Sequence, residues 1–174
     1  MVKLLGEVKV ERFIDQIVQQ LPYEIDDKEQ FMYKFHHNEA ICFIGYEKKK
    51  TLLSKAYHFT VKIQKEIQGE GSFQEEVQYQ FHKQKWISKK GDQLLKLANQ
   101  CFQLNWTDLD MVKLNIVEEK GTRTLTMSLL PGSYNVLLFP PLTQGIEIYP
   151  KEMKTLVQLI DLISARLDKS LAVE

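Results

Sequence analysis

The chain has 174 residues and a formal net charge of zero, because 23 lysine and arginine residues balance 23 aspartate and glutamate residues. This length most simply corresponds to a single globular domain over residues 1–174, and a hydrophobic fraction of 44% is typical of a soluble globular protein. The balanced charge argues against a molecule-wide field that would attract nucleic acid or an anionic membrane.

The cysteines and the start of the chain bear on the cellular compartment. Cys42 and Cys101 lie in separate apolar runs and form no Cys-x-x-Cys pair, so we expect buried, reduced thiols. Residues 1–7 lack the apolar run of a signal peptide, and no segment approaches the roughly 20 apolar residues of a membrane span. The sequence therefore predicts a cytoplasmic protein without a membrane partner.

Helical periodicity predicts three helices. The first covers residues 10–21 and ends at Pro22, the second begins at Asp92 and carries its apolar stripe to Phe102, and the third runs from Pro150 to Leu167. Each of them has one apolar stripe, so each should pack against a sheet or another helix along one side only.

Seven segments have the pattern of strands. Six alternate between apolar and polar residues, and one, at residues 40–44, is apolar on both parities, as a central strand would be. The seven are Phe31–Phe35, Ala40–Ile44, Tyr57–Ile63, Phe73–His82, Val112–Ile116, Leu125–Leu129 and Tyr134–Leu138. A polar connection containing Lys48–Lys50 is expected between the second and third of these strands.

Turn residues suggest how the strands pair. His37–Asn38 offers a turn between the first two strands. A hairpin centred on Glu70 would place Val61 opposite Tyr79 and Ile63 opposite Val77, so that the apolar residues share one side.

Turn-forming residues also predict two turns later in the chain. A turn at Glu119–Lys120 would place Leu114 opposite Leu125, and Pro131–Gly132 has the residues of a type II turn before the strand at 134–138. Adjacent hairpins with few helices predict an α+β fold. We expect an antiparallel sheet of about six to seven strands with three helices packed mainly on one face, a two-layer sandwich.

The hairpin centred on Glu70 also creates the sharpest chemical candidate. It would place His58 opposite His82 on the polar face, where two imidazoles could share a metal ion with Glu75 or Glu76. Two histidines are too few for a structural zinc site, and two solvated histidines on an open sheet face are the simpler interpretation. A small metal-dependent enzyme built on His58 and His82 is one alternative function. No cofactor motif is present, so no cofactor is expected.

Residues 83–90 are basic and contain Trp86. Lysines beside an aromatic ring can contact phosphates and stack on a base, which makes a weak nucleic-acid binder a second alternative. The competing interpretation is that Trp86 closes the core at a strand-to-helix corner while the lysines remain solvated. The zero net charge favours this competing interpretation, so nucleic acid is not the expected partner.

Two features favour a binding role. The polar face of the sheet would present long side chains able to form hydrogen bonds, among them Lys62, Gln64, Gln78 and Gln80. An ordinary solvated sheet face would have the same composition. The second feature is a stiff apolar loop before the last helix.

That loop contains Phe139, Pro140 and Pro141. Two prolines hold the backbone extended and lower the entropy lost when the loop contacts a partner. Such a loop could rim a pocket, mediate a homodimer, or only lead the chain across the sheet. The sequence therefore favours a non-enzymatic binding or protein-interaction module, whose partner is a protein, a small ligand or a second copy of the chain.

Overall fold

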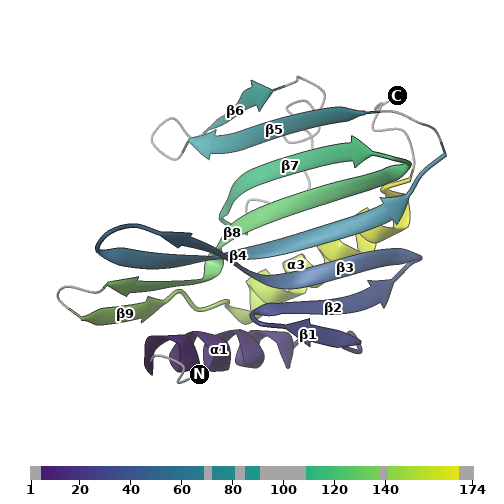
Figure 1. The fold of residues 1–174 in the computed structure, drawn as a ribbon. Coiled ribbons are helices and arrows are strands. Elements are labelled where there is room, and N and C mark those ends of the chain that lie inside the picture. Colours follow the sequence, from purple (N-terminus) through teal and green to yellow (C-terminus); the bar gives the residue numbers. More distant parts are fainter. Residues whose placement is uncertain (1–4, 69–71, 81–84, 91–108, 138–140, 169–174) are drawn as a thin grey trace.

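The computed structural model describes residues 5–68, 72–80, 85–90, 109–137 and 141–168 (Figure 1). Within these residues there are two helices, α1 (Leu5–Val18) and α3 (Pro150–Arg166). The strands are β1 (Asp27–Glu29), β2 (Met32–His37), β3 (Ala40–Lys50), β4 (Ser54–Glu66), β5 (Phe73–Gln80), β6 (Lys85–Lys90), β7 (Met111–Glu119), β8 (Thr122–Leu137) and β9 (Leu142–Gly145).

The described strands form one antiparallel sheet in the order β1-β2-β3-β4-β8-β7-β5-β6, and β9 pairs with the far end of β8. Helix α3 packs against β3 and β4, and α1 packs against β8 (Figure 1). The expectation of a mainly antiparallel sheet with helices is confirmed. The described residues form nine strands rather than the expected six to seven, and the helix expected at residues 92–102 lies outside them.

The apolar stripes expected for the first and third helices are confirmed. The buried residues are Val10, Ile14, Ile17 and Val18 in α1, and Met153, Leu156, Leu159, Ile160, Ile163 and Ser164 in α3. With one face of the sheet they form one hydrophobic core. Pro150 occupies the first turn of α3, and the Tyr149 backbone N–H donates a hydrogen bond to the Glu152 carboxylate at 2.7 Å, which fixes the start of this helix. Neither described helix is both long and apolar enough to cross a membrane.

Two hairpins close through two-residue turns. Asn38 and Glu39 join β2 to β3, and Lys120 and Gly121 join β7 to β8; all four residues have positive φ, as a type I′ turn requires. The predicted turn after His37 is confirmed.

For β7 and β8 the predicted pairing is right but the register is wrong by two residues. Leu114 lies opposite Met127 rather than Leu125, because the turn is centred after Lys120 and not before it. A shift of two residues keeps every side chain on the same face, so the alternation of apolar residues could not detect the error.

The predicted hairpin between β4 and β5 is wrong. Val61 on β4 lies between Ile44 on β3 and Met127 on β8, whereas Tyr79 on β5 pairs with Trp86 on β6. Strands β8 and β7 therefore separate β4 from β5 (Figure 1). Alternation identifies the buried face of a strand and leaves the identity of its neighbour open.

The predicted turn at Pro131–Gly132 is also wrong, because both residues lie inside the continuous strand β8. On β4, Tyr57 pairs with Tyr134 and Phe59 pairs with Leu129, so residues 130–133 of β8 span the single residue between Tyr57 and Phe59. This irregularity is a bulge that bends both strands. The turn-forming residues are used here to redirect a strand instead of reversing it.

The remaining differences between the predicted and the observed secondary structure lie in two lysine-rich segments and two short strands. Lys48–Lys50, expected in a polar connection, form the end of β3. Lys85–Lys90, expected at a corner before a helix, form the edge strand β6. Strands β1 and β9, of three and four residues, were not predicted. The edge strand β1 is short and fully charged, which blunts pairing with another chain.

Candidate functional site

Two cations from different strands hold the C-terminal end of α3, and no local sequence pattern connects them to this helix. Lys65 on β4 donates a hydrogen bond to the Ser164 carbonyl oxygen at 3.1 Å, and Arg123 on β8 donates one to the Leu167 carbonyl oxygen at 2.8 Å. Both carbonyl groups lie in the last turn or cap of the helix, where no further helical N–H can reach them. The positive charges also complement the negative end of the helix dipole, so these contacts fix α3 on the sheet.

Each cation has a carboxylate partner. The Lys65 ammonium lies 3.4 Å from Asp168, and the Arg123 guanidinium donates two hydrogen bonds to one Glu118 oxygen at 3.0 and 2.8 Å. Lys65, with a side chain only 9% exposed, is committed to these contacts. Lys65 and Arg123 are therefore anchoring residues of the fold.

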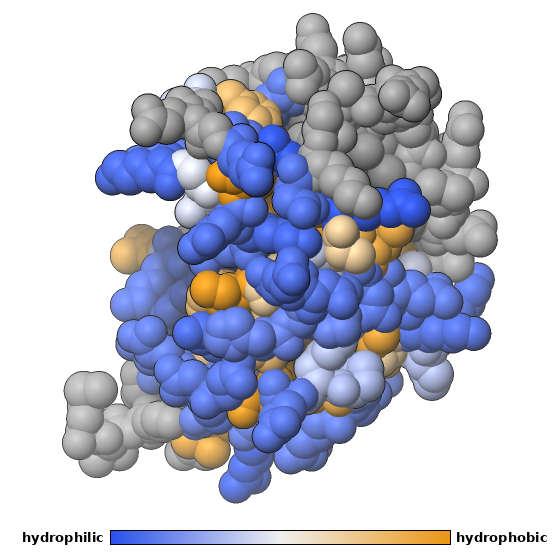
Figure 2. All heavy atoms as spheres, turned by 90° about the vertical axis from the view of Figure 1, so that its right-hand side faces the viewer, coloured by the Kyte–Doolittle hydropathy of each residue, from blue (hydrophilic) through white to orange (hydrophobic). Residues whose placement is uncertain are grey.

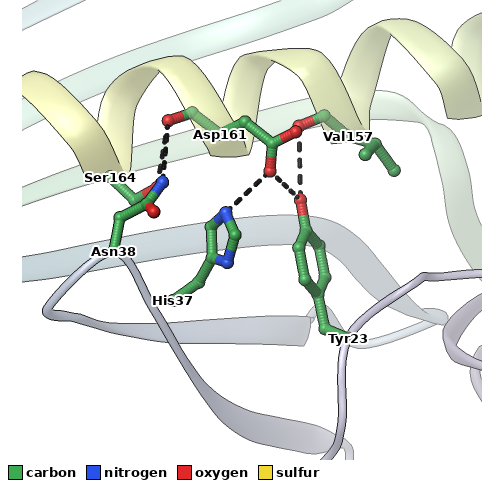
Figure 3. A network of polar contacts seen from close by, with 6 residues as sticks. All are labelled: Tyr23, His37, Asn38, Val157, Asp161 and Ser164. Atoms are coloured by element: carbon green, nitrogen blue, oxygen red, sulfur yellow. Dashed lines mark hydrogen bonds and ion pairs between the residues drawn. The ribbon is translucent and has the colours of Figure 1, made fainter.

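A second polar network joins the β2–β3 hairpin to the same helix (Figure 3). One oxygen of the Asp161 carboxylate lies 2.8 Å from the Tyr23 hydroxyl and 2.8 Å from Nε2 of His37. Asn38 in the hairpin turn donates a hydrogen bond to the Ser164 hydroxyl at 3.1 Å. Burial and then the Asp161 carboxylate raise the pKa of Tyr23, so this phenol stays protonated and acts as a donor. The network fixes the hairpin turn relative to α3.

Between these two anchors the surface is hollowed into a groove of about 530 Å³, which we call the end groove. It is lined by Glu39, Ile41, Gln64, Lys65, Glu66, Thr122 and Asp168. A smaller hollow of about 340 Å³ shares Gln64 and Thr122 with it and continues over Val117, Glu119, Lys120 and Thr124. Figure 2 looks at this end of the molecule, whose surface is mainly hydrophilic with small hydrophobic spots.

The end groove offers carboxylates and hydrogen-bonding groups. Glu39 and Glu66 are exposed, and within the described residues neither has an ion-pair partner. On the floor, Gln64 donates a hydrogen bond to the Thr124 hydroxyl at 3.3 Å, which leaves its amide oxygen to accept from a ligand. A group with positive charge and N–H donors would complement this arrangement best.

Among the sheet-face residues expected to bind a partner, Lys62 and Gln78 have described side chains, and these two lie far apart on the sheet. Lys62 lies on β4 with its ammonium 5.5 Å from the centre of the Phe43 ring. Gln78 lies on β5, where its amide is 3.5 Å from Glu76, and strands β8 and β7 lie between Gln78 and Lys62. The backbone of Gln80 ends β5, and its side chain lies outside the description. Binding by this face stays a prediction.

Only part of the predicted proline loop is described. Pro141 is exposed and directly precedes β9, whereas Phe139 and Pro140 lie outside the described residues. Leu137 pairs with Leu142, so Pro141 lies beside the paired ends of β8 and β9, at the end of the sheet opposite the end groove (Figure 1). The role of the loop in binding stays a prediction.

The metal site considered as an alternative, on His58 and His82, loses its geometric basis. His58 lies opposite Glu47 on β3, and β5 is not its neighbour, so the register that would bring His82 to His58 is absent. His82 itself lies outside the described residues, among which no group of three His, Cys, Asp or Glu side chains could hold a metal ion. Burial and then Lys49 lower the pKa of His58, while Glu47 acts in the opposite direction.

The predicted burial of the cysteines can be checked in part, whereas nucleic-acid binding by the basic segment cannot. Cys42 is fully buried, as expected, and burial raises the pKa of its thiol to about 12, so it is unreactive at neutral pH. Cys101 lies outside the described residues. In the basic segment 83–90, residues 85–90 form β6, and its contact with nucleic acid stays untested.

Sequence reasoning missed the anchors and most of the groove, because their residues come from distant segments. Asp161 lies on the predicted third helix and Lys65 beside a predicted strand, but nothing local indicates that Asp161 contacts Tyr23 and His37 or that Lys65 contacts the end of this helix. The one signal was Gln64, which belongs to the polar sheet face expected to bind a ligand.

Comparison with known proteins gives the chain a family. Comparisons with curated proteins and with solved structures found no match. A family model described as "Protein of unknown function (DUF3156)" matches residues 17–167, which include all nine described strands and α3. The chain therefore belongs to the DUF3156 family.

Proposed function

We propose that the protein is a non-enzymatic binding module that takes a small, positively charged ligand in the end groove. The observation that carries this proposal is a groove of about 530 Å³ that is supported on one side by the buried contact of Lys65 with Ser164 and on the other by the half-buried contact of Tyr23 with Asp161. Small-molecule sites typically occupy about 300–1,000 Å³ and are largely formed before the ligand arrives. The volume of the end groove lies within this range, and the contacts of Lys65 and Asp161 support its walls.

The charges of the groove support a cationic ligand. Glu39 and Glu66 both line it, one on the β2–β3 turn and one at the end of β4. The lysine that lines it, Lys65, already contacts Ser164 and Asp168 and is therefore not available to an anion. An amine or guanidinium could pair with either carboxylate while it donates a hydrogen bond to Gln64.

Calorimetric titration with two cationic probes, agmatine and spermidine, tests the proposal, with citrate as the anionic comparison. We expect saturable binding of at least one cation and none of citrate. The double variant Glu39→Gln and Glu66→Gln should weaken binding about tenfold, because exposed charge pairs each contribute up to about 1 kcal/mol. Glu47→Gln, an exposed carboxylate outside the groove, is the matched control and should bind like the wild type.

Native mass spectrometry separates this proposal from self-association. A retained small ligand would add mass to the single chain, and that mass should be absent from the double variant. Multiples of the bare chain mass, unchanged by the double variant, would instead support the homodimer hypothesis. Equal affinity of the wild type and the double variant for the cations would contradict binding in the end groove.

A further inference from the structure

The opposite end of the sheet gathers exposed leucines. Seven large hydrophobic residues of the described chain are exposed, and four of them lie here: Leu52, Leu53, Leu137 and Leu142. Leu52 is 91% exposed and Leu53 is 58% exposed. Single exposed leucines are ordinary on a protein surface, but a cluster of them marks a contact site. We call these four residues the leucine tip.

Two neighbouring hairpins carry the leucine tip. Leu52 and Leu53 form the loop between β3 and β4, and Leu137 pairs with Leu142 in the hairpin of β8 and β9. Ser54 pairs with Leu137, so the two hairpins lie side by side, and both project at the left of Figure 1. The strand β4 has 13 residues, which puts the tip about 40 Å from the end groove.

The loop that presents the first two leucines is closed by hydrogen bonds. The Thr51 N–H donates to the Ser54 carbonyl oxygen at 2.8 Å, and the Ser54 N–H donates to the Thr51 hydroxyl at 3.0 Å. This closure holds Leu52 and Leu53 outward. A contact made by a preformed loop loses less conformational entropy than one made by a flexible segment.

Lysines surround the leucine tip. Lys48 and Lys55 lie 2.9 and 3.6 Å from Glu7 on α1, which neutralises part of their charge. Lys49 and Lys50 are exposed, and within the described residues they have no ion-pair partner. As neighbours on a strand they point to opposite faces, so positive charge flanks the leucines on both sides.

We propose that the leucine tip docks on an anionic lipid bilayer. Exposed leucines at the end of a projecting hairpin can enter the boundary between head groups and acyl chains, while flanking lysines attract anionic head groups. Near the tip, Glu7 on α1 is already paired, and Glu47, the acidic residue nearest to the tip along the described part of the β3–β4 hairpin, lies opposite His58. The local charge is therefore positive, although the whole chain is neutral. The zero net charge of the whole chain, which argued against binding to an anionic membrane, does not reveal this local excess of positive charge.

Vesicle co-sedimentation of the full chain tests the proposal. The vesicles contain phosphatidylcholine alone or with about one third phosphatidylserine, at about 0.1 M salt. We expect binding to the anionic vesicles that weakens as salt is added, and at least tenfold weaker binding to phosphatidylcholine alone. The double variant Lys49→Gln and Lys50→Gln should bind anionic vesicles about 30-fold more weakly.

Leucine variants separate insertion from simple charge attraction. The double variant Leu52→Ser and Leu53→Ser should lose at least tenfold in affinity, whereas Leu52→Phe with Leu53→Phe should retain it. Leu162→Ser on α3, at a leucine 36% exposed and outside the tip, is the matched control and should bind like the wild type. The tip variants change exposed residues, so their unfolding midpoints should match the wild type, and the midpoint of every variant is measured to show that the fold is intact.

Three results would overturn the proposal. The first is no binding of the wild type to anionic vesicles at low salt. The second is equal binding by the leucine and control variants. The third is a dimer, detected by size-exclusion chromatography with light scattering, that the leucine variant converts to a monomer, because the tip would then be covered by a second copy of the chain.

Discussion

Replacing Ser133 with alanine should destabilise the bend that gives β8 its two directions. Ser133 is 5% exposed, and its hydroxyl replaces missing sheet hydrogen bonds at the bulge. It accepts a hydrogen bond from the Phe59 N–H at 3.0 Å and donates one to the Leu129 carbonyl oxygen at 2.8 Å. Alanine fits the space but supplies neither contact, so the Phe59 N–H would be buried without a partner.

The size of the effect follows from that unpaired group. A buried N–H without an acceptor costs about 1–3 kcal/mol, so we expect the free energy of unfolding to fall by about 2 kcal/mol. For a chain of this length, a change of 1 kcal/mol lowers the melting temperature by about 2–4 °C. The expected decrease in melting temperature is therefore about 4–8 °C.

Urea unfolding followed by far-ultraviolet circular dichroism measures the change, with Ser128→Ala as control. Ser128 lies on the same strand, is 7% exposed, and forms none of the hydrogen bonds at the bend. The control should lose clearly less stability than Ser133→Ala. Equal losses in the two variants, or a loss below about 0.5 kcal/mol in Ser133→Ala, would refute the role given to the hydroxyl.

Three further predictions concern other parts of the molecule. Lys65→Met should lower the free energy of unfolding by about 1–3 kcal/mol, because the Ser164 carbonyl group at the end of α3 loses a charged donor. Urea titrations measure this change, and an unchanged midpoint would show that the cation does not anchor the helix. The pKa of His58 is lower in the folded protein than its ordinary value of 6.5, so its contribution to stability is present above that pH and is lost as the pH falls through the folded pKa. His58→Gln should therefore reduce the loss of stability between about pH 7 and pH 5 in thermal melts, and an identical pH profile would contradict this. The thiol of Cys42, with a pKa of about 12, should react with a thiol reagent only when urea unfolds the chain, and rapid labelling of Cys42 in the native protein, located by peptide mapping, would contradict its burial.

Much of the secondary structure could be predicted from local patterns. The apolar stripes of α1 and α3 repeat over several turns. The alternation of apolar and polar residues in β2, β4, β5 and β7 is long enough to be distinguished from a chance pattern. The missed strands lack such a pattern. Strand β1 is three charged residues, β9 is four residues, and β6 has no clear alternation in Lys85–Lys90.

Strand order could not be predicted in the same way. Val61 is equally well buried beside Tyr79, as the sequence suggested, or beside Met127, as the structure has it, because both place apolar residues on one face. The choice depends on long-range packing of the whole sheet. The Pro131–Gly132 pair shows a related limit: its residues favour a change of direction, and both a turn and a bulge provide one.

The candidate sites depend on this long-range order. Glu39, Gln64, Thr122 and Asp168 line one groove only because β3, β4 and β8 are neighbours and α3 ends beside them. The leucine tip likewise requires the β8–β9 hairpin to lie beside β4. Neither site has a motif within a single segment. The sequence therefore predicted a binding role in general but only a few of the residues that form these surfaces.

Chemical-shift mapping of backbone amides during titration with agmatine or spermidine tests binding in the end groove most directly. The largest shift changes should fall on groove residues, in particular Glu39, Gln64 and Thr122, and saturate together. The Glu39→Gln and Glu66→Gln double variant should show much smaller changes at the same ligand concentration. Changes centred on other parts of the sheet, or none at saturating concentrations, would contradict the proposal that this groove is the ligand site.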